Sequence, residues 1–407
     1  MSNAADVTAA ASAAPPRVAT GIWTSLGAVA IGHLAVDLCT GIWPVYKTIA
    51  GLDLAKAGLI ATLGNLFGNA LQPVFGVLAD RGWRKALLVS GLVLAGAVTW
   101  TPYADRYSIL FFLVLLTSIG SAAYHPAGTG AAGALSERRT GVMVAVFMTG
   151  GYLGYGFSQL VFAATYQAHR LGTGLLFLAP LLTGLSVAAL VPRAAGRGQS
   201  LVEWKRALRA EMGPLRILFL VQFFTSAINL GLVFLLPDLL LARGAPTWIA
   251  RGGGHAALVL GGALSLLPAG HAADRFGARR VLVATNVVAG ALTAWLVFVP
   301  SPSLVELAVI AGFGAFNGAN NVVLVAEGNR LFPGQASAAS ALLMGFPWCF
   351  ASLAPVIVGN LADPAHGGNP VTGLGWLSLC VPCTLVASAL VPRRKDPFST
   401  TLRSAGV

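Results

Sequence analysis

Apolar runs of about 20 residues follow one another along nearly the whole chain, and this pattern limits the fold more than any other feature. One such run crosses a bilayer core of about 30 Å as a helix. Of the 407 residues, 56% are hydrophobic and 10% are charged, whereas a soluble domain carries about 25% charged residues. Because the runs are continuous rather than alternating, and lipid forces backbone groups to pair within the segment, the sequence predicts an all-α membrane protein.

The runs form two groups of six, separated by a polar and basic interruption. In the first group we expect helices over residues 22–47, 55–79, 85–103, 107–134, 140–166 and 171–192. In the second group we expect them over 215–241, 247–272, 279–300, 303–328, 336–361 and 370–392. The predicted organisation begins with a disordered cytoplasmic N-terminal tail (1–21) and a six-helix bundle (22–192). A cytoplasmic linker (193–214), a second six-helix bundle (215–392) and a cytoplasmic tail (393–407) follow.

Lysine and arginine are distributed unevenly about these twelve spans. If the N-terminus is cytoplasmic, 20 of the 26 basic residues fall on the cytoplasmic side, as the positive-inside rule requires. We therefore expect a multi-pass membrane protein with both termini in the cytoplasm. The net charge of +12 is spread over loop ends, so the lipid bilayer, and no nucleic acid, is the expected partner, and we expect a monomer.

A short loop motif occurs twice in the chain. The segment "GVLADRGWRK" (76–85) is repeated as "GHAADRFGARR" (270–280), and both copies follow the second helix of their group. Asp80 and Asp274 are 194 positions apart. An even number of helices per group makes the two groups parallel repeats, related by an axis along the membrane normal.

This motif resembles the loop signature of the major facilitator superfamily, Gly-x-Leu-Ala-Asp-Arg-x-Gly-Arg-Lys. Together with the twelve spans, the resemblance to this superfamily extends over about residues 20–395. Trp83 stands where the second glycine is expected. The resemblance implies two pseudo-symmetric bundles, with Asp80 bridging to the opposite half when the transporter faces outward. Topology anchoring by arginine plus helix capping is the alternative. The expected gating residues are Gly76, Asp80, Arg81, Arg84, Asp274, Arg275 and Arg280.

A histidine and an aspartate interrupt the first span in "GHLAVDLCTG" (32–41). A charge at the bilayer centre costs at least about 2.5–3.5 kcal/mol, so such side chains face protein or water. His33 and Asp37 lie one helical turn apart on one face, and His125 of the fourth span could approach them. Because histidine changes charge near neutral pH, we expect these three residues to couple transport to protons. Hydrogen bonding that only holds the bundle together is the alternative.

Polar residues recur on every third span, the first, fourth, seventh and tenth. In a facilitator these four helices surround a central cavity, and the second and fifth helices line its sides. The same amides could instead tie helices together. The expected substrate-binding residues are Asn65, Asn69, Gln72, Tyr152, Tyr155, Gln159, Gln222, Asn229, Asn317, Asn320 and Asn321.

Four segments resemble the fosmidomycin-resistance type of bacterial efflux carrier: "LFGNALQPVFGVLADR", the His-Asp pair, "YHPAG" (124–128) and "GNLAD" (359–363). The fourth-helix arginine motif is absent, and Tyr155 stands where the antiporter motif of the fifth helix has proline. The resemblance favours export and a location in the bacterial inner (plasma) membrane. The amide-rich helix faces favour a small polar organic solute, a metabolite or an antibiotic, and the His-Asp pair favours proton coupling. We therefore expect a secondary active transporter that works by proton-coupled antiport. The alternatives are proton-coupled uptake of an organic anion, lipid flipping, and a membrane sensor that has kept a transporter fold.

The sequence contains no motif that is typical of an enzyme. We find no Gly-x4-Gly-Lys-Ser/Thr segment, no zinc-ligand spacing and no clear nucleophile elbow. The Cys380–Cys383 pair lies inside the twelfth apolar run, where cysteine usually serves as a small packing residue. We therefore expect no enzyme activity, no cofactor and no metal.

Overall fold

The computed structural model describes residues 19–136, 139–192, 212–301, 303–331 and 336–392. These residues are mostly helical, and no strand occurs among them, as an all-α protein requires. The expected tails and linker fall mainly outside the described residues. The first helix begins at Ala19 and the seventh at Met212, three residues earlier than expected in each case. Pro214 fits there because the first turn of a helix needs no proline N–H.

The first half of the chain forms a series of helices in which π-helical and 3-10 segments (η) adjoin the α-helices. They are α1 (Ala19–Thr40), α2 (Ile42–Ile49), α3 (Leu54–Leu78), η1 (Ala79–Trp83), α4 (Arg84–Ala95), η2 (Gly96–Tyr103), α5 (Tyr107–Ala134), α6 (Thr140–Ala168), η3 (Arg170–Phe177) and α7 (Leu178–Leu190).

The second half follows the same plan. Its elements are α9 (Met212–Ala242), η4 (Ile249–Gly253), α10 (Gly254–Phe276), α11 (Ala278–Phe298), α12 (Ser303–Leu331), α13 (Ala336–Ala351), α14 (Ala354–Ala362), η5 (Pro364–His366), α15 (Pro370–Leu377) and α16 (Cys380–Leu390).

Several expected spans consist of two helical pieces, and proline explains two of these breaks. A proline ring clashes with the carbonyl four residues before it and donates no N–H. Helix α1 ends at Thr40, four residues before Pro44, and α13 ends at Ala351, four residues before Pro355. The chain direction continues across each break, so one span is kept as two shorter helices.

Ten helical stretches of the described residues are long and apolar enough to cross a membrane. One of them, Leu54–Tyr103, is 50 residues long and contains both α3 and α4. Helix α6, with 29 residues, is not among the ten. The structure is therefore that of a multi-pass membrane protein, although this criterion selects ten stretches where the sequence predicts twelve.

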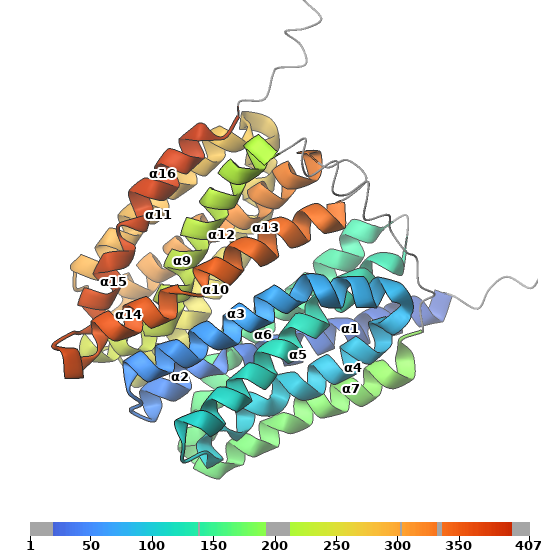
Figure 1. Ribbon diagram of the computed structural model, residues 1–407, viewed down its shortest axis with the longest axis horizontal. Helices are drawn as coiled ribbons and strands as arrows, with labels where there is room; N and C mark the ends of the chain where they lie inside the picture. Colours follow the sequence, from blue (N-terminus) through green and yellow to red (C-terminus); the bar gives the residue numbers. More distant parts are fainter. Residues whose placement is uncertain (1–18, 137–138, 193–211, 302, 332–335, 393–407) are drawn as a thin grey trace, which may run out of the picture.

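The helices pack mainly within each half (Figure 1). In the first half α1 packs against α6, and α5 packs against α3 and α4, whereas in the second half α12 packs against α10 and α11. The halves meet where α3 lies beside α13 and α14, where α6 meets α10, and where α2 meets α9. We call the end of the molecule that carries α2 and η5 the α2 end, and the opposite end the η1 end.

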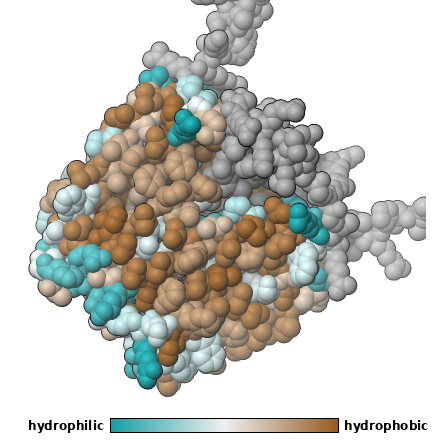
Figure 2. Space-filling view, viewed as in Figure 1, coloured by the Kyte–Doolittle hydropathy of each residue, from teal (hydrophilic) through white to brown (hydrophobic). Residues whose placement is uncertain are grey.

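The outer surface is suited to lipid. Figure 2 shows a face that is hydrophobic across its middle, with hydrophilic residues gathered toward its edges. Elsewhere Leu264, Leu267 and Leu304 are 79%, 87% and 78% exposed. Apolar exposure on this scale marks a surface that contacts something other than water, and here the apolar helices identify it as the lipid-facing surface.

Glycines with positive φ turn the chain at both copies of the repeated loop motif. Gly82, in η1, has a φ of 99°, and Gly277, between α10 and α11, has a φ of 86°. Only glycine adopts this region at little cost. With Asp80 aligned to Asp274, Gly277 is equivalent to Trp83, so the two turning glycines are one residue out of register. This shift explains why tryptophan occupies the usual glycine position in the first copy.

Candidate functional site

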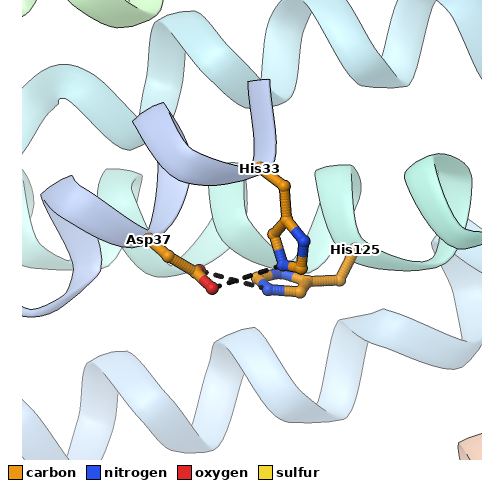
Figure 3. A group of neighbouring side chains, drawn as sticks. All are labelled: His33, Asp37 and His125. Atoms are coloured by element: carbon orange, nitrogen blue, oxygen red, sulfur yellow. Dashed lines mark ion pairs between the residues drawn. The ribbon is translucent and has the colours of Figure 1, made fainter. Parts of the chain in front are cut away.

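His33, Asp37 and His125 form one cluster, which we call the His-Asp-His cluster (Figure 3). His33 and Asp37 lie one turn apart on α1, and His125 reaches them from α5. His33 Nε2 lies 3.3 Å from Asp37 Oδ2, and His125 Nε2 lies 3.2 Å from Asp37 Oδ1. The structure thus brings together all three residues that the sequence suggested, and each histidine contacts a different oxygen of the same carboxylate.

Backbone carbonyls fix the orientation of both imidazole rings. His33 Nδ1 lies 2.8 Å from the carbonyl oxygen of Phe147, and His125 Nδ1 lies 2.8 Å from that of Ser121. A carbonyl oxygen only accepts hydrogen bonds, so each Nδ1 must carry the hydrogen. Each Nε2 therefore bonds to Asp37 only if an additional proton lies between the nitrogen and the carboxylate.

The cluster is enclosed on the His33 side and open on the His125 side. The His33 side chain is 2% exposed and its ring stacks on Phe147 with a centroid distance of 4.0 Å. The side chains of Asp37 and His125 are 15% and 31% exposed. Tyr124 closes the buried side, where its hydroxyl donates a 2.6 Å hydrogen bond to the carbonyl of Val29. His125 is therefore the most exposed member of the cluster.

Gly151 of α6 makes room for the cluster. A Cβ atom at this position would lie 2.5 Å from His33 Nε2 and 2.7 Å from Asp37 Oδ2, well inside ordinary van der Waals contact. Gly151 is not among the site residues expected from the sequence. The sequence alone does not indicate such a role for a glycine, because the role depends on which side chains lie opposite the missing Cβ.

The cluster also has the ligand types of a metal site, which the sequence analysis did not expect. Two imidazoles and one carboxylate are common ligands of divalent transition metals, and the ligand atoms of these three residues all lie within 4.8 Å of one another. A metal ion and the bridging protons would use the same Nε2 atoms, so they are alternative occupants of the cluster.

The expected substrate-binding amides divide into two groups. On α3, Gln72 Nε2 donates to Asn69 Oδ1 at 2.9 Å, and Asn69 Nδ2 donates to Ser352 Oγ of the second half at 3.3 Å. Gln222 on α9 donates to Asn321 Oδ1 on α12 at 2.8 Å. Asn69, Gln72 and Asn321 are only half-buried, and they remain candidates for solute contact, as do the half-buried Asn65, Asn229 and Tyr152.

Two of the expected amides lie inside the second half instead. Asn320 is fully buried and exchanges hydrogen bonds of 2.9 and 3.0 Å with Asn286 of α11. Asn286 also donates to Ser388 of α16 at 3.0 Å. Asn317 lines an internal cavity of about 10 Å³ together with Asn286, room for about one water molecule. The observed hydrogen bonds of Asn320 join helices within the second half, and solute binding by Asn317 and Asn320 stays a prediction.

Gln159 of α6 is the most unusual of the expected residues. It is 1% exposed, and neither its side-chain oxygen nor its side-chain nitrogen has a hydrogen-bond partner among the described residues. One turn away, the backbone carbonyl of Tyr155 accepts a 2.9 Å hydrogen bond from His255 Nε2 of α10. Tyr155 and Gln159 thus lie where the two halves meet, and an unpaired buried amide is costly unless something binds it.

Comparison with known proteins identifies the family. The family model of the Major Facilitator Superfamily matches residues 25–252, more than half of the chain. The chain belongs to this superfamily.

Curated relatives of this facilitator include one protein from each of two bacteria. The chain is 23% identical over 380 residues to the fosmidomycin resistance protein of Escherichia coli (strain K12), covering 87% of this chain and 89% of that protein. It is 22% identical over 368 residues to the uncharacterized MFS-type transporter YfnC of Bacillus subtilis (strain 168), covering 85% and 88%.

Solved structures of facilitators share the fold. A bacterial homolog of the human lysosomal transporter Spinster, in an inward-facing and unoccupied conformation, superposes with a TM-score of 0.73 at 15% identity, covering 94% of this chain and 100% of that one. A point mutant of the nucleoside transporter NupG superposes with a TM-score of 0.71 at 13% identity, covering 90% and 98%. The expected facilitator fold is confirmed, and the family identifies a membrane transporter rather than an enzyme.

The expected gating residues of this facilitator lie at the η1 end. Asp80 pairs with Arg84 of its own half at 3.5 Å. Asp274 pairs with Arg330 of α12 at 2.5 Å, a partner that the sequence analysis missed. Neither carboxylate bridges the halves in the described residues, so the role of these residues in gating stays a prediction. The side chains of Arg81, Arg275 and Arg280 are exposed, and Gly76 is half-buried beside Pro126.

Two ion pairs at the α2 end were not predicted. Lys47 of α2 pairs with Asp238 of α9, and Arg243, just after α9, pairs with Glu306 of α12 at 2.6 Å. In the sequence, Lys47 counted only as one of the few basic residues on the outer side. The sequence did contain one indication of this pair, because Asp238 is a carboxylate within the apolar seventh span and needs a cation nearby.

Proposed function

We propose that this facilitator is a secondary transporter that exports a small polar organic solute, a metabolite or an antibiotic, across the bacterial inner membrane in exchange for protons. Transport proceeds by alternating access, in which the two halves open the site to one side of the membrane at a time. The observation that carries the proposal is the geometry of Asp37, whose two oxygens each face an imidazole Nε2 at 3.2–3.3 Å.

The number of protons in the His-Asp-His cluster determines its charge. With a proton on each Nε2, two imidazolium ions face one carboxylate and the cluster carries one positive charge. Removing one proton makes the cluster neutral and leaves one nitrogen lone pair facing a carboxylate oxygen, which is repulsive. Proton loss therefore weakens the contact between Asp37 on α1 and the histidines, and frees Asp37 to interact with a solute.

Half-buried polar side chains support a polar solute. Asn69, Gln72 and Asn321 offer both donors and acceptors from the two halves of the chain. The unpaired amide of Gln159 lies among the contacts between the halves. A solute with several hydrogen-bonding groups would satisfy these amides, whereas a purely apolar solute would leave them unpaired at a cost of about 1–3 kcal/mol for each buried group.

We further propose twelve crossings in two six-helix bundles, over residues 22–192 and 215–392, with the η1 end and both termini in the cytoplasm. Dividing the 50-residue stretch at the Gly82 turn and adding the 29-residue α6 to the ten apolar stretches gives twelve. Arginines 81, 84, 275 and 330 near the η1 end support its cytoplasmic location by the positive-inside rule.

Export rather than uptake is proposed from the similarity to the fosmidomycin resistance protein, whose name describes resistance to an antibiotic. Proton-coupled uptake of an organic anion uses the same cluster and differs only in the direction of solute flow. A membrane sensor that kept the transporter fold would bind a solute without moving it.

The first experiment measures proton movement in liposomes. The purified protein is reconstituted with a pH-sensitive dye inside the vesicles and is challenged with a panel of polar metabolites and antibiotics, with fosmidomycin among them. Wild type is compared with Asp37→Asn, which keeps the shape of the side chain and removes its charge. We expect at least one solute to move protons through wild type and none to do so through Asp37→Asn.

Two further conditions separate the alternatives. Solute flux that survives in Asp37→Asn with unchanged proton movement would contradict the proposal. Binding of a solute without flux would favour the sensor. Adding a chelator, and in a separate sample Zn²⁺, tests the metal alternative: transport that requires Zn²⁺ and stops with the chelator would assign the cluster to a metal rather than to protons.

A further inference from the structure

Lys47 is the most deeply buried cation of the described residues. Its side chain is 0% exposed, and its ammonium group bonds to Asp238 Oδ2 of α9. The same nitrogen donates to Thr48 Oγ1 at 3.0 Å and lies 4.6 Å from the ring centroid of Phe234. Thr48 Oγ1 in turn lies 3.0 Å from Asp238 Oδ1. Lys47 and Asp238 therefore form a closed, water-poor ion pair.

This ion pair joins the two halves of the protein. Lys47 and Asp238 are 191 positions apart, on α2 of the first half and α9 of the second. Among the ion pairs of the described residues, it is the one that crosses between the halves. Its two helices come together at the α2 end, so the pair holds the halves against each other there.

Hydrogen bonds reinforce the same contact between the halves. They run from Val356 N to Thr62 Oγ1 at 3.1 Å, from Ala55 N to Asp363 Oδ2 at 3.3 Å, and from His255 Nε2 to the Tyr155 carbonyl at 2.9 Å. At the η1 end, by contrast, Asp80 and Asp274 pair within their own halves. The described residues thus form a structure that is closed at the α2 end.

A buried ion pair is well suited to a contact that must open. Separating the charges inside the protein is costly, because each would be left buried and unpaired. If the halves separate at the α2 end, both charges enter water together and much of that cost disappears. The pair therefore stabilises the fully closed arrangement and resists partial opening.

From this geometry we infer that the Lys47–Asp238 pair keeps the α2 end closed and that it separates once in each transport cycle. The inference rests on the proposed alternating-access function, and it adds residues outside the repeated loop motif to the machinery of that cycle. Breaking the pair is expected to shift the equilibrium toward the state that is open at the α2 end. Couplings between sites in proteins are typically about 5- to 150-fold.

The test measures how fast a reporter cysteine is labelled from the α2 side. Thr40→Cys, half-buried on α1 one turn from Asp37 toward the α2 end, is introduced into a protein whose four native cysteines are replaced by alanine or serine. A membrane-impermeant maleimide is then added to the α2 side of vesicles. We expect Lys47→Met to raise the labelling rate at least about 5-fold.

The matched control is Lys56→Met. Lys56 also lies near the α2 end and pairs with Asp53 at 3.1 Å, but its side chain is 60% exposed and its partner is in the same half. Its loss should leave labelling unchanged. If Lys47→Met does not fold because Asp238 is left unpaired, the double variant Lys47→Met/Asp238→Leu removes both charges and carries the same expectation. Labelling at the wild-type rate in every folded variant would overturn the inference.

The labelling assay needs no solute, so it separates the inference from the proposed function. Faster labelling of Lys47→Met, in a protein that moves no solute from the panel, would support the role of the pair and count against transport of those solutes. As a second readout, Lys47→Cys/Asp238→Cys is oxidised to a disulfide in the liposome assay. Flux that stops on oxidation and returns on reduction supports the inference, whereas flux that continues through the disulfide overturns it.

Discussion

Replacing Gly151 by alanine should disable the His-Asp-His cluster without removing any of its groups. The added Cβ would lie 2.5 Å from His33 Nε2 and 2.7 Å from Asp37 Oδ2. Ordinary contact begins near 3.4 Å, and the nearest atoms are His33 Cε1 at 2.4 Å and Asp37 Oδ2 at 2.7 Å, so the two side chains would have to move by about 1.0 and 0.7 Å. Contacts of 3.2–3.3 Å at Asp37 do not survive such a displacement with useful geometry.

The energetic effect is best measured against a second glycine on the same helix. A Cβ at Gly156 would lie 3.5 Å from Val259 Cγ1, which is ordinary contact. Both substitutions gain helix propensity of up to about 1 kcal/mol, but only Gly151→Ala overpacks its surroundings, which costs about 1–3 kcal/mol. The difference between the two variants therefore isolates the crowding of the cluster.

Two assays check this prediction. The thermal unfolding midpoint in detergent should be lower for Gly151→Ala than for Gly156→Ala. Proton-coupled flux in liposomes should fall about tenfold or more, because a 1.4 kcal/mol loss corresponds to a factor of ten and the crowding falls directly on the groups proposed to bind protons. The reasoning is refuted if Gly151→Ala transports protons and unfolds like Gly156→Ala.

Three further predictions concern stability. Asn320→Ala should destabilise the protein by about 1–3 kcal/mol, because Asn286 loses a buried partner. Flux per folded molecule should be unchanged, and a selective loss of flux would indicate that Asn320 binds the solute. Glu306→Gln, which leaves Arg243 buried without a counter-charge, should cost about 3–5 kcal/mol, and Arg243→Met/Glu306→Leu should recover most of this loss in a thermal-unfolding assay. The backbone N–H that Asp53 caps in the first turn of α3 holds the pKa of Asp53 below its usual range. This cap therefore stabilises the protein above the unfolded pKa of about 3.9, and the stabilisation is lost as pH falls through the folded pKa. Asp53→Asn should make unfolding less sensitive to acid in this range, and an unchanged acid profile would argue against the cap.

The sequence predicted features that depend on one helix at a time. Asp37 stood out because a carboxylate within an apolar span needs an unusual environment, and helical spacing put His33 on the same face. The approach of His125 was expected from the family arrangement of helices, and the structure agrees. The repeated loop motif was also visible in the sequence, because its glycines and charges are adjacent in the chain.

Features that depend on contact between distant helices could not be predicted. Asn317, Asn320 and Asn321 are nearly consecutive on α12, but successive residues point about 100° apart around a helix. Asn321 therefore accepts a hydrogen bond from α9, whereas its neighbour Asn320 accepts one from α11. The partner of Lys47 lies 191 positions away, and no periodicity within either helix indicates that they meet.

The hydrogen bonds at Nδ1 of His33 and His125 limit the route that a proton can take. A histidine passes a proton through its ring only if one nitrogen receives a proton while the other releases one. The Nδ1 hydrogen of His33 is held by a backbone carbonyl at 2.8 Å, so this ring cannot hand a proton on to the far side. His125 differs, because its Nδ1 lies 3.1 Å from the Ser121 hydroxyl as well as 2.8 Å from the Ser121 carbonyl. If the cluster binds protons as proposed, a proton on His33 enters and leaves through Nε2 alone. Such a group stores a proton without conducting it, and it moves the proton across a membrane only when the protein changes which side that nitrogen meets.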